Sequence, residues 1–341
     1  MNKSIKSHQP RLSAVITGYG SYAPPGILTN EDLAKMVDTS DEWINTRTGI
    51  KSRHICGEKE STADLATEAA KNALAVAKLK PEQLDVIIVA TITPEMVFPS
   101  TACFVQRNLG AKNAWAFDLM AACSGFIYGM SILQQFLESG RFRNALVIGA
   151  ETLTKITNYK DRTSCILFGD GAGAVVLEAR PIVEGQPKNG IIYTTMYADG
   201  SNWETLNCQA YGSRNPISRP LDNPDKVYMQ IKGREVYQMA VRRIVETITE
   251  CLERCNLTID DIKMVVSHQM NARIIESAAK RLQLPPEKYF INITEYGNTS
   301  AASVPLAFDQ VICEGKIKRG DIVILVAFGA GLTWGAAVVR F

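Results

Sequence analysis

The sequence predicts an α/β fold built from two similar halves, and two internal repeats predict it. Residues 117–150 are expected to form a strand, a turn with a cysteine, a helix and a second strand, and the same order returns about 175 residues later, in 291–327. A second pair of segments, starting at Glu68 and Glu246, repeats with an offset of 178. Each half therefore alternates helices and strands, a pattern typical of parallel sheets covered by helices.

The first half has clear element signals in chain order. Residues 14–19 have the apolar character of a strand, and Ser40 is a helix cap that precedes two acidic residues, with Gly49 ending that helix. Residues 65–77 carry the apolar spacing of a helix. The almost entirely apolar residues 86–90 then predict a buried strand.

Turn-forming residues separate the two halves. Pro181, Gly185 and Pro187 interrupt the pattern, so we predict a first half over 1–185 and a second over 186–341. Residues 199–225 show little periodicity and are rich in Asn, Pro, Gly and Ser, which predicts an irregular insertion. Such a loop is suited to shaping substrate access.

Composition limits the classes of function. The chain has 341 residues, 46% of them hydrophobic and 21% charged, and a net charge of +2, which favours neither nucleic acid nor a membrane as partner. No run reaches the roughly 18 apolar residues of a spanning helix, and the polar, basic residues 1–11 do not resemble a signal peptide. We therefore expect a cytoplasmic protein.

The eight cysteines show no paired framework, and reduced thiols are expected in a chain of this size. Cys251 and Cys255 lie four residues apart on a predicted helix, but the chain has only three histidines to complete a zinc site. Core packing is the better interpretation, and no metal site is predicted.

The glycine-rich residues 168–173 resemble a nucleotide-binding loop only superficially. A dinucleotide fingerprint requires a strand before it and a helix after it. Here apolar residues 165–168 precede the glycines and apolar residues 174–177 follow, which we interpret as strand, tight turn and strand. No dinucleotide cofactor is expected.

Three polar residues are candidates for one active site. Cys123 follows a strand and opens a helix, where backbone N–H groups favour a thiolate, although a helix end alone contributes only about 0.3–1 kcal/mol. His268 follows an apolar strand at its carboxyl end, where open α/β sheets place their sites. Asn298 stands at the position that the 175-residue offset pairs with Cys123. A buried cysteine, a packed histidine and ordinary Gly-Asn turn chemistry are the simpler interpretations of each residue alone.

Seven motifs in order across both halves resemble one family. They are Asp41-Glu42-Trp43-Ile44, Thr46-Arg47-Thr48-Gly49-Ile50, Ala122-Cys123-Ser124-Gly125, the glycine-rich residues 168–173, His268-Gln269 with Asn271 and Arg273, residues 297–303, and Phe328-Gly329 with Thr333-Trp334-Gly335. The chain resembles the 3-oxoacyl-(acyl-carrier-protein) synthase III family, the initiating condensing enzymes of type II fatty acid synthesis. The resemblance implies a thiolase-like five-layered αβαβα fold and an acyltransferase that forms a homodimer. It implies no cofactor, with acetyl-CoA or a short acyl-CoA and malonyl acyl carrier protein as substrates.

The resemblance also implies roles for individual residues. Cys123 corresponds to the nucleophile, His268 and Asn298 to the groups that assist decarboxylation, and the N–H groups of Cys123 and Ala330 to the oxyanion hole. CoA-binding positions fall on Thr39, Trp43, Arg47, Arg162, Gly233 and Asn271. Acyl-pocket positions fall on Phe98, which would reach the partner subunit, Phe168 and Phe328. Carrier-protein positions fall on Gln269, Arg273, Lys280 and Arg281.

Three departures from the family pattern affect the shape of the site. Met270 replaces a small residue, Ser267 stands where Pro is expected, and Ala330 interrupts a glycine run. A paralogue of polyketide or other secondary metabolism with the same Cys, His and Asn is the alternative function. A carrier-protein binding module without activity would lack the nucleophile, so Cys123 argues against it, and a cysteine hydrolase is the remaining alternative.

Overall fold

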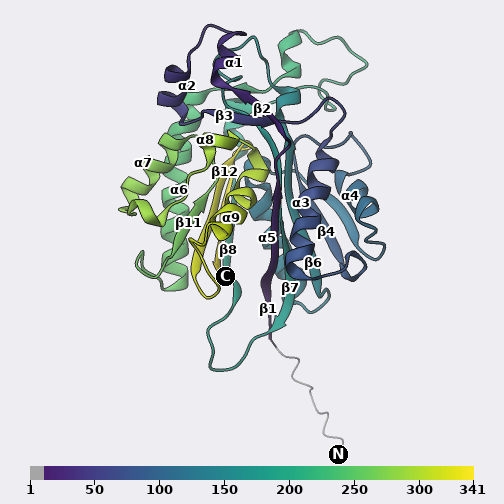
Figure 1. Cartoon of the computed structure of the whole chain (residues 1–341), viewed down its shortest axis with the longest axis vertical. Helices are drawn as coiled ribbons and strands as arrows, with labels where there is room; N and C mark the ends of the chain where they lie inside the picture. Colours follow the sequence, from purple (N-terminus) through teal and green to yellow (C-terminus); the bar gives the residue numbers. More distant parts are fainter. Residues whose placement is uncertain (1–10) are drawn as a thin grey trace, which may run out of the picture.

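The computed structural model describes residues 11–341, which form two large mixed sheets, the two-stranded sheets β2-β3 and β9-β10, and the covering helices (Figure 1). The first half contains β1 (Leu12–Tyr22), β2 (Gly26–Thr29), α1 (Asn30–Ala34), α2 (Asp41–Thr48), β3 (Ser52–Ile55), α3 (Thr62–Ala77), β4 (Val86–Ala90), α4 (Thr101–Leu109), β5 (Trp115–Leu119), α5 (Gly125–Glu138), β6 (Asn144–Thr152) and β7 (Asp170–Pro181). The second half contains β8 (Gly190–Ala198), β9 (Leu206–Asn207), β10 (Gln230–Ile231), α6 (Gly233–Cys255), β11 (Met264–Ser267), α7 (Ala272–Leu282), α8 (Ile293–Tyr296), α9 (Ser303–Cys313), β12 (Ile322–Gly329) and β13 (Thr333–Arg340).

The two large sheets have matching topology. The first has the order β1-β7-β6-β4-β5 and the second the order β11-β12-β13-β8. β4 runs parallel to β5 and β6, and β11 runs parallel to β12, whereas the remaining neighbours in both sheets are antiparallel. The prediction of parallel sheets is therefore correct only for these pairings. The chain passes from the first sheet to the second between Pro181 and Gly190.

The helices and sheets form five layers. α3 and α4 pack with β4, β6 and β7 on one outer side, and α6 and α7 pack with β11, β12 and β13 on the other. α5 and α9 lie between the two sheets in one continuous core that includes strands of both halves (Figure 1). The predicted αβαβα fold is confirmed. Burial of an apolar helix face on each sheet surface is what holds the layers together.

The repeat offset of 178 extends to the start of the central helices. Lys78 after α3 and Asn256 after α6 both have left-handed backbone, with φ of 54° and 52°. Two short 3₁₀ turns, η2 (Ala122–Ser124) and η7 (Ser300–Ala302), precede α5 and α9, and each begins with a residue at positive φ. Ala301 is thus the counterpart of Cys123, and the pairing of Cys123 with Asn298 is wrong by three residues.

The offset of 175 arises because the two central helices differ in length. α5 has 14 residues and α9 has 11, so an offset of 175 applies only at their carboxyl ends. Asn298 lies two residues before η7 and five residues before the first residue of α9, so it does not stand at a helix start.

The glycine-rich segment lies in a strand, and its interpretation as a tight turn is wrong. Asp170–Pro181 is one continuous strand, and Gly171 and Gly173 have no left-handed backbone. A Cβ atom on Gly173 would lie 2.6 Å from the backbone nitrogen of Leu306 in α9. Glycine is required here because the central helix approaches the strand closely. A helix does not follow the segment, so the rejection of a dinucleotide fingerprint stands.

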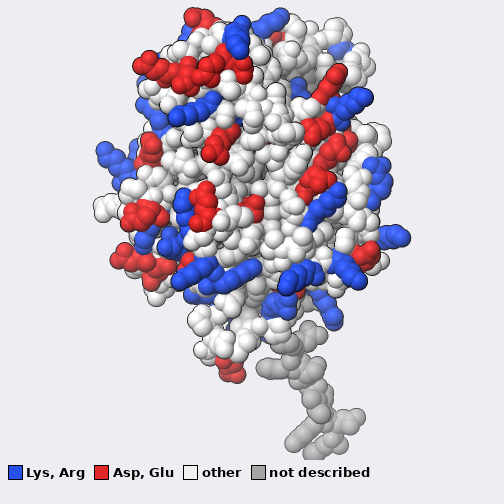
Figure 2. Space-filling model, in the orientation of Figure 1, with Lys and Arg blue, Asp and Glu red and all other residues white. Residues whose placement is uncertain are grey.

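Charged side chains are mixed in sign over the face seen in Figure 2, with a largely uncharged region between them. Among residues 11–341, no helix combines the length and the apolar character needed to cross a membrane.

Candidate active site

The predicted catalytic residues meet in one largely apolar cavity of about 510 Å³. Its polar lining includes Cys123, His268, Asn298 and Ser300, and its apolar walls come from segments far apart in the sequence. Two of these predicted catalytic side chains follow strands at their carboxyl ends, β5 for Cys123 and β11 for His268. Asn298 reaches the same place from the segment before η7, where it pairs with Phe168.

Cys123 is held in η2 against the end of β12. It is 6% exposed, and a Cβ atom on Gly329 would lie only 2.7 Å from its backbone nitrogen. Burial raises the pKa of the Cys123 thiol to about 12, although contacts from the Ser300 hydroxyl and from the N–H groups of Cys123 and Ala330 act in the opposite direction. The start of a helix is therefore insufficient to ionise this thiol.

The two N–H groups of the predicted oxyanion hole converge at the cysteine. Those of Cys123 and Ala330 are both close enough to the thiol to stabilise its anion. Ala330 does not have positive φ, so the replacement of glycine introduces no backbone strain here. The arrangement provides two donors for an oxygen that becomes negative next to Cys123.

His268 is a neutral side chain in this site. It is 2% exposed, and its backbone N–H donates to Val326 in β12 over 2.8 Å. Burial lowers the pKa of the imidazole to about 3, and neither ring nitrogen has a hydrogen-bond partner among the described residues. Both nitrogens therefore remain available to a ligand in the cavity.

Asn298 is held rigidly by its backbone and its side chain. Its N–H donates to Leu167 over 2.8 Å, and its carbonyl accepts from Gly169 over 3.0 Å. The side-chain Oδ1 accepts from the Ser300 N–H over 2.9 Å. Because Oδ1 is occupied, the Nδ2 group is the part of the amide left to donate to a ligand.

The predicted acyl-pocket residues separate into two sets. Phe168 and Phe328 are buried and line the cavity. Phe98 is 81% exposed and is not part of the lining, whereas its neighbour Val97 is. Met270, the departure noted in the sequence, also lines the cavity.

Three predicted CoA-binding residues form one cluster near α2. The guanidinium groups of Arg47 and Arg162 lie 4.5 and 4.4 Å from the centre of the Trp43 ring. Arg162 also forms an ion pair with Asp38 at 3.3 Å. Thr39, on the same segment, has a buried hydroxyl without a partner among the described residues. A flat aromatic face beside two guanidinium groups is suited to a planar base with phosphates.

The other two predicted CoA positions are Asn271 and Gly233. Like the four near α2, they do not line the cavity. Asn271 caps α7 by accepting from the Arg273 N–H over 2.9 Å, and its Nδ2 donates to the Arg47 carbonyl over 3.0 Å. Gly233 is exposed at the start of α6, between the cavity residues Ile231 and Val236. An added Cβ atom would meet nothing within 4 Å there.

The predicted carrier-protein residues do not all lie on the surface. Arg273, Lys280 and Arg281 are exposed on α7. Gln269 is 1% exposed, and its amide donates to Ser267 and Phe290 and accepts from Asn292 and Ile293. A side chain whose hydrogen bonds are all internal cannot contact a protein partner, so the carrier-protein role of Gln269 is wrong. It fixes the segment between β11 and α8.

Two polar residues of the site were missed in the sequence. Glu151 is fully buried at the end of β6, and Ser300 lines the cavity in a left-handed conformation, with φ of 47°. The signal for Glu151 was its position directly after an apolar strand, the same signal that identified His268. Ser300 had no comparable signal, because its conformation depends on contacts between the halves.

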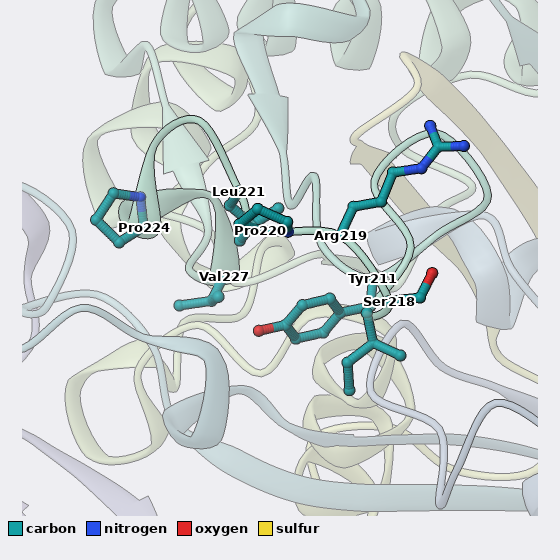
Figure 3. A pocket seen from close by; sticks show the side chains of 8 residues that line it. Tyr211, Ser218, Arg219, Pro220, Leu221, Pro224 and Val227 are labelled. Atoms are coloured by element: carbon teal, nitrogen blue, oxygen red, sulfur yellow. The ribbon is translucent and has the colours of Figure 1, made fainter.

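A second pocket of about 380 Å³ lies in the irregular insertion (Figure 3). It shares Tyr211 with the main cavity, and its apolar lining includes Pro220, Leu221 and Val227. Arg219 extends away from the tyrosine ring in this view. The predicted insertion thus forms part of the cavity wall, since residues 206–208 and 210–212 also line it.

Comparison with known proteins identifies the family. Residues 117–200 match the family model described as 3-oxoacyl-[acyl-carrier-protein (ACP)] synthase III, and residues 252–341 match its C-terminal model. The beta-ketoacyl-[acyl-carrier-protein] synthase III of Caldanaerobacter subterraneus is 55% identical over 97% of this chain and 98% of its own.

Two solved structures extend the comparison. The 3-oxoacyl-[acyl-carrier-protein] synthase III of Aquifex aeolicus is 49% identical, with a TM-score of 0.87 over 96% of this chain and 100% of its own. The priming beta-ketosynthase of the R1128 polyketide pathway is 32% identical, with a TM-score of 0.90 over 98% of both chains. The fold alone therefore does not distinguish a 3-oxoacyl-[acyl-carrier-protein] synthase III from a polyketide priming enzyme. The sequence identity does, since it is 49% to the first structure and 32% to the second. The chain belongs to the 3-oxoacyl-(acyl-carrier-protein) synthase III family of acyltransferases.

Proposed function

We propose that the chain starts type II fatty acid synthesis by condensing an acetyl or other short acyl group with malonyl acyl carrier protein, with Cys123, His268 and Asn298 as its catalytic residues. The products are 3-oxoacyl carrier protein, CO₂ and CoA. The observation that carries this proposal is the convergence of these three side chains, from both halves of the chain, on one apolar cavity. No cofactor is required beyond the acyl-CoA substrate.

In the first step, Cys123 attacks the thioester carbonyl of acyl-CoA and becomes acylated. The carbonyl oxygen becomes negative as the sulfur adds, and the N–H groups of Cys123 and Ala330 lie where they can bind it. Phe168 and Phe328 offer an apolar wall to the acyl chain. CoA then leaves as the thiol.

In the second step, malonyl carrier protein loses CO₂ and its thioester oxygen takes on negative charge. A neutral His268 N–H and the Asn298 Nδ2 group can donate to this oxygen. The carbanion equivalent attacks the acyl group on Cys123 and releases the enzyme thiol. An apolar cavity suits this chemistry, because it excludes the water that would protonate the carbanion or hydrolyse the acyl-enzyme.

The function is tested by intact mass and product analysis. Acetyl-CoA is expected to add one acetyl group at Cys123, and malonyl carrier protein is expected to convert this adduct into acetoacetyl carrier protein. Labelling by longer or branched acyl-CoA alone would favour a paralogous condensing enzyme. Hydrolysis of the adduct at the same rate with and without malonyl carrier protein would favour a hydrolase, and the absence of labelling by any acyl-CoA would reject the proposal.

The polyketide alternative is not favoured. The relative named beta-ketoacyl-[acyl-carrier-protein] synthase III is 55% identical over nearly the whole chain, whereas the polyketide priming enzyme is 32% identical. The chain's free cysteines agree with a reducing compartment, so we place the reaction in the cytoplasm.

The CoA nucleotide is proposed to bind at the cluster of Trp43, Arg47 and Arg162. An adenine can stack on the indole, and two guanidinium groups can meet the phosphates. Gly233, at the start of α6, leaves room for the pantetheine arm near the cavity mouth. Thr39 and Asn271 complete the proposed CoA site, with Asn271 holding α2 and α7 together.

The exposed cations of α7 are proposed to dock the acidic carrier protein. Changing Arg273 and Lys280 together to Glu is expected to raise the apparent KM for malonyl carrier protein about tenfold or more, because attraction becomes repulsion. Acyl transfer from acetyl-CoA should not change. Lys112→Glu, an exposed cation before β5, is the control. An unchanged KM in the double variant would exclude this surface as the docking site. Arg281, which is also exposed on α7, is proposed to belong to the same docking surface.

A homodimer is proposed to cover an apolar patch beside the cavity. Met96, Val97, Phe98 and Met120 are 45%, 88%, 81% and 73% exposed, and Val97 and Met120 also line the cavity. Exposed apolar side chains grouped in this way are typical of a protein interface. Phe98→Asp is expected to give a monomer in analytical ultracentrifugation, whereas Val183→Asp, outside the patch, should stay dimeric. A monomeric wild-type chain would exclude the dimer.

A further inference from the structure

The imidazole of His268 lines the cavity without a hydrogen bond that fixes its orientation. The residue is 2% exposed, and neither ring nitrogen has a partner among residues 11–341. A catalytic histidine is commonly oriented by a carboxylate or carbonyl that accepts from one of its ring nitrogens. Since the described residues provide no such acceptor, the direction of this ring depends on the packing around it and on the backbone that carries it.

The side-chain amide of Gln269, the next residue, makes all of its hydrogen bonds to surrounding backbone groups. Its Nε2 donates to the carbonyl groups of Ser267 and Phe290, each over 3.0 Å. Its Oε1 accepts from the N–H groups of Asn292 and Ile293 over 2.9 and 3.2 Å. An amide has two N–H donors and an oxygen with two lone pairs, so its capacity is used completely. Its orientation is fixed as well, because two carbonyls face one end and two N–H groups face the other.

These contacts hold the backbone on both sides of the histidine. The bond from Gln269 to the Ser267 carbonyl joins the residue after His268 to the residue before it. The His268 N–H donates to Val326 in β12 over 2.8 Å, and the Gln269 N–H donates to the Ser303 hydroxyl in α9 over 2.6 Å. The histidine segment is therefore tied to β12, to α9 and to the start of α8.

The groups that anchor the amide are themselves held. Asn292 is 5% exposed, and its Nδ2 donates to the Oε1 atom of Gln310 in α9 over 2.9 Å. The amide of Gln310 in turn donates to Glu314 over 2.9 Å. Ser303, the first residue of α9, is 2% exposed. The histidine segment is thus connected to α9 at two places, and α9 lies in the central layer between the sheets (Figure 1).

The internal repeat shows that this strand end folds without an amide. With the offset of 178, His268 corresponds to Ala90 and Gln269 to Thr91. Ala90 and Thr91 are also buried, at 0% and 3% exposed, but a short hydroxyl side chain stands where the second half has Gln269. The amide therefore occurs in the half that carries the histidine, which indicates a task for it in addition to folding.

We propose that Gln269 is a positioning residue for His268, and that its amide holds the histidine backbone so that the imidazole N–H points at the thioester oxygen of malonyl carrier protein during condensation. This inference rests on the proposed function, in which His268 donates to that oxygen. Gln269 does not line the cavity, so it acts only through His268 and does not touch the substrate. This role replaces the docking role that the sequence suggested for the residue.

A small displacement of the histidine is enough to slow the reaction. A donor stabilises a developing oxyanion only at hydrogen-bond distance and with good alignment. Replacing Gln269 by Met keeps roughly the length of the side chain but removes all four hydrogen bonds of the amide. The backbone groups left without partners then favour a shift of the segment, because buried unpaired groups are costly. A misplacement of about 1 Å can cost about 10²-fold in rate.

The test is a double-mutant cycle of Gln269→Met with His268→Ala, measured on enzyme acylated in advance. Release of CO₂ and formation of acetoacetyl carrier protein report condensation, and the initial release of CoA reports acylation. Gln269→Met alone is expected to slow condensation about 10- to 100-fold and acylation less than about twofold. In the His268→Ala background it should change condensation less than about twofold, because the group that it positions is absent. A merely structural role would slow both half-reactions and would add to the loss in His268→Ala.

Gln134→Met is the matched control. Gln134 is 5% exposed on α5, and its amide donates to Glu138 over 3.1 Å and accepts from Thr194 over 3.1 Å. It does not line the cavity. Loss of this buried amide should leave both half-reactions at the wild-type rate.

Ser303→Ala is the second variant, for the case that Gln269→Met does not fold. It removes only the acceptor of the Gln269 N–H, and it is expected to slow condensation about three- to tenfold, again only when His268 is present. In either variant, an unchanged condensation rate, equal losses in both half-reactions, or a full loss that persists in His268→Ala would overturn the proposal. Failure of the proposed function is a separate result, namely condensation at the wild-type rate in His268→Ala itself.

Discussion

A Cys123→Ser variant is expected to lose acyl transfer from acetyl-CoA by a factor on the order of 10⁴ to 10⁶, the range seen when a catalytic nucleophile is removed. The serine hydroxyl would occupy the same place in η2, beside the N–H groups of Cys123 and Ala330. It would be a far weaker nucleophile, since a hydroxyl ionises much less readily than a thiol. Binding of acyl-CoA should persist, because the cluster around Trp43 is unchanged.

The measurement is release of CoA together with the intact mass of the protein. Wild type should gain one acetyl group, and Cys123→Ser should gain none on the same time scale. Cys103→Ser, which changes an exposed cysteine on α4, is the matched control and should be labelled like the wild type. Acetylation of Cys123→Ser at the wild-type rate would show that another residue is the nucleophile.

Asn298→Ala and His268→Ala are each expected to slow condensation by about 10²–10³, the usual cost of removing one donor to a developing oxyanion. Acylation of Cys123 should change much less, because neither side chain belongs to the first oxyanion site. This split between the two half-reactions is the signature of the proposed roles. A purely structural effect would reduce both steps together.

The split is measured with enzyme acylated in advance. Formation of acetoacetyl carrier protein and release of CO₂ report condensation, and the initial release of CoA reports acylation. Asn113→Ala, an exposed amide that donates to the Glu82 carbonyl, is the control. Since burial keeps His268 neutral above about pH 3, condensation should show no loss of rate attributable to histidine protonation between pH 5 and 7. Equal losses in both steps would contradict the assignment.

The catalytic set could be predicted because each signal is local. Cys123 and His268 follow apolar strands, and the position at a strand's carboxyl end has a known meaning in α/β folds. The family resemblance then supplied Asn298, Ala330 and the cluster of Trp43, Arg47 and Arg162. The structure brings the first four of these seven residues to one cavity and the last three to a separate cluster.

Local signals failed where contacts between elements decide the outcome. Gln269 is polar and directly follows His268, but the hydrogen bonds of its amide are all made within the fold. The glycines at 171 and 173 look like turn residues, yet they allow α9 to approach β7. The offset of 175 assigned Asn298 and Cys123 to equivalent positions of the two halves, because α9 is three residues shorter than α5.

The sequence by itself determined the two-fold repeat, the α/β class and the candidate nucleophile, because periodicity, caps and strand ends are encoded over a few residues. Only the tertiary structure decided that Gly329 lies against Cys123, that Gln269 is internal, and that Ser300 lines the same cavity as Cys123. These facts depend on how two halves of the chain pack across the central helices. Burial and charge at such a contact arise from residues more than a hundred positions apart, and no local pattern records them.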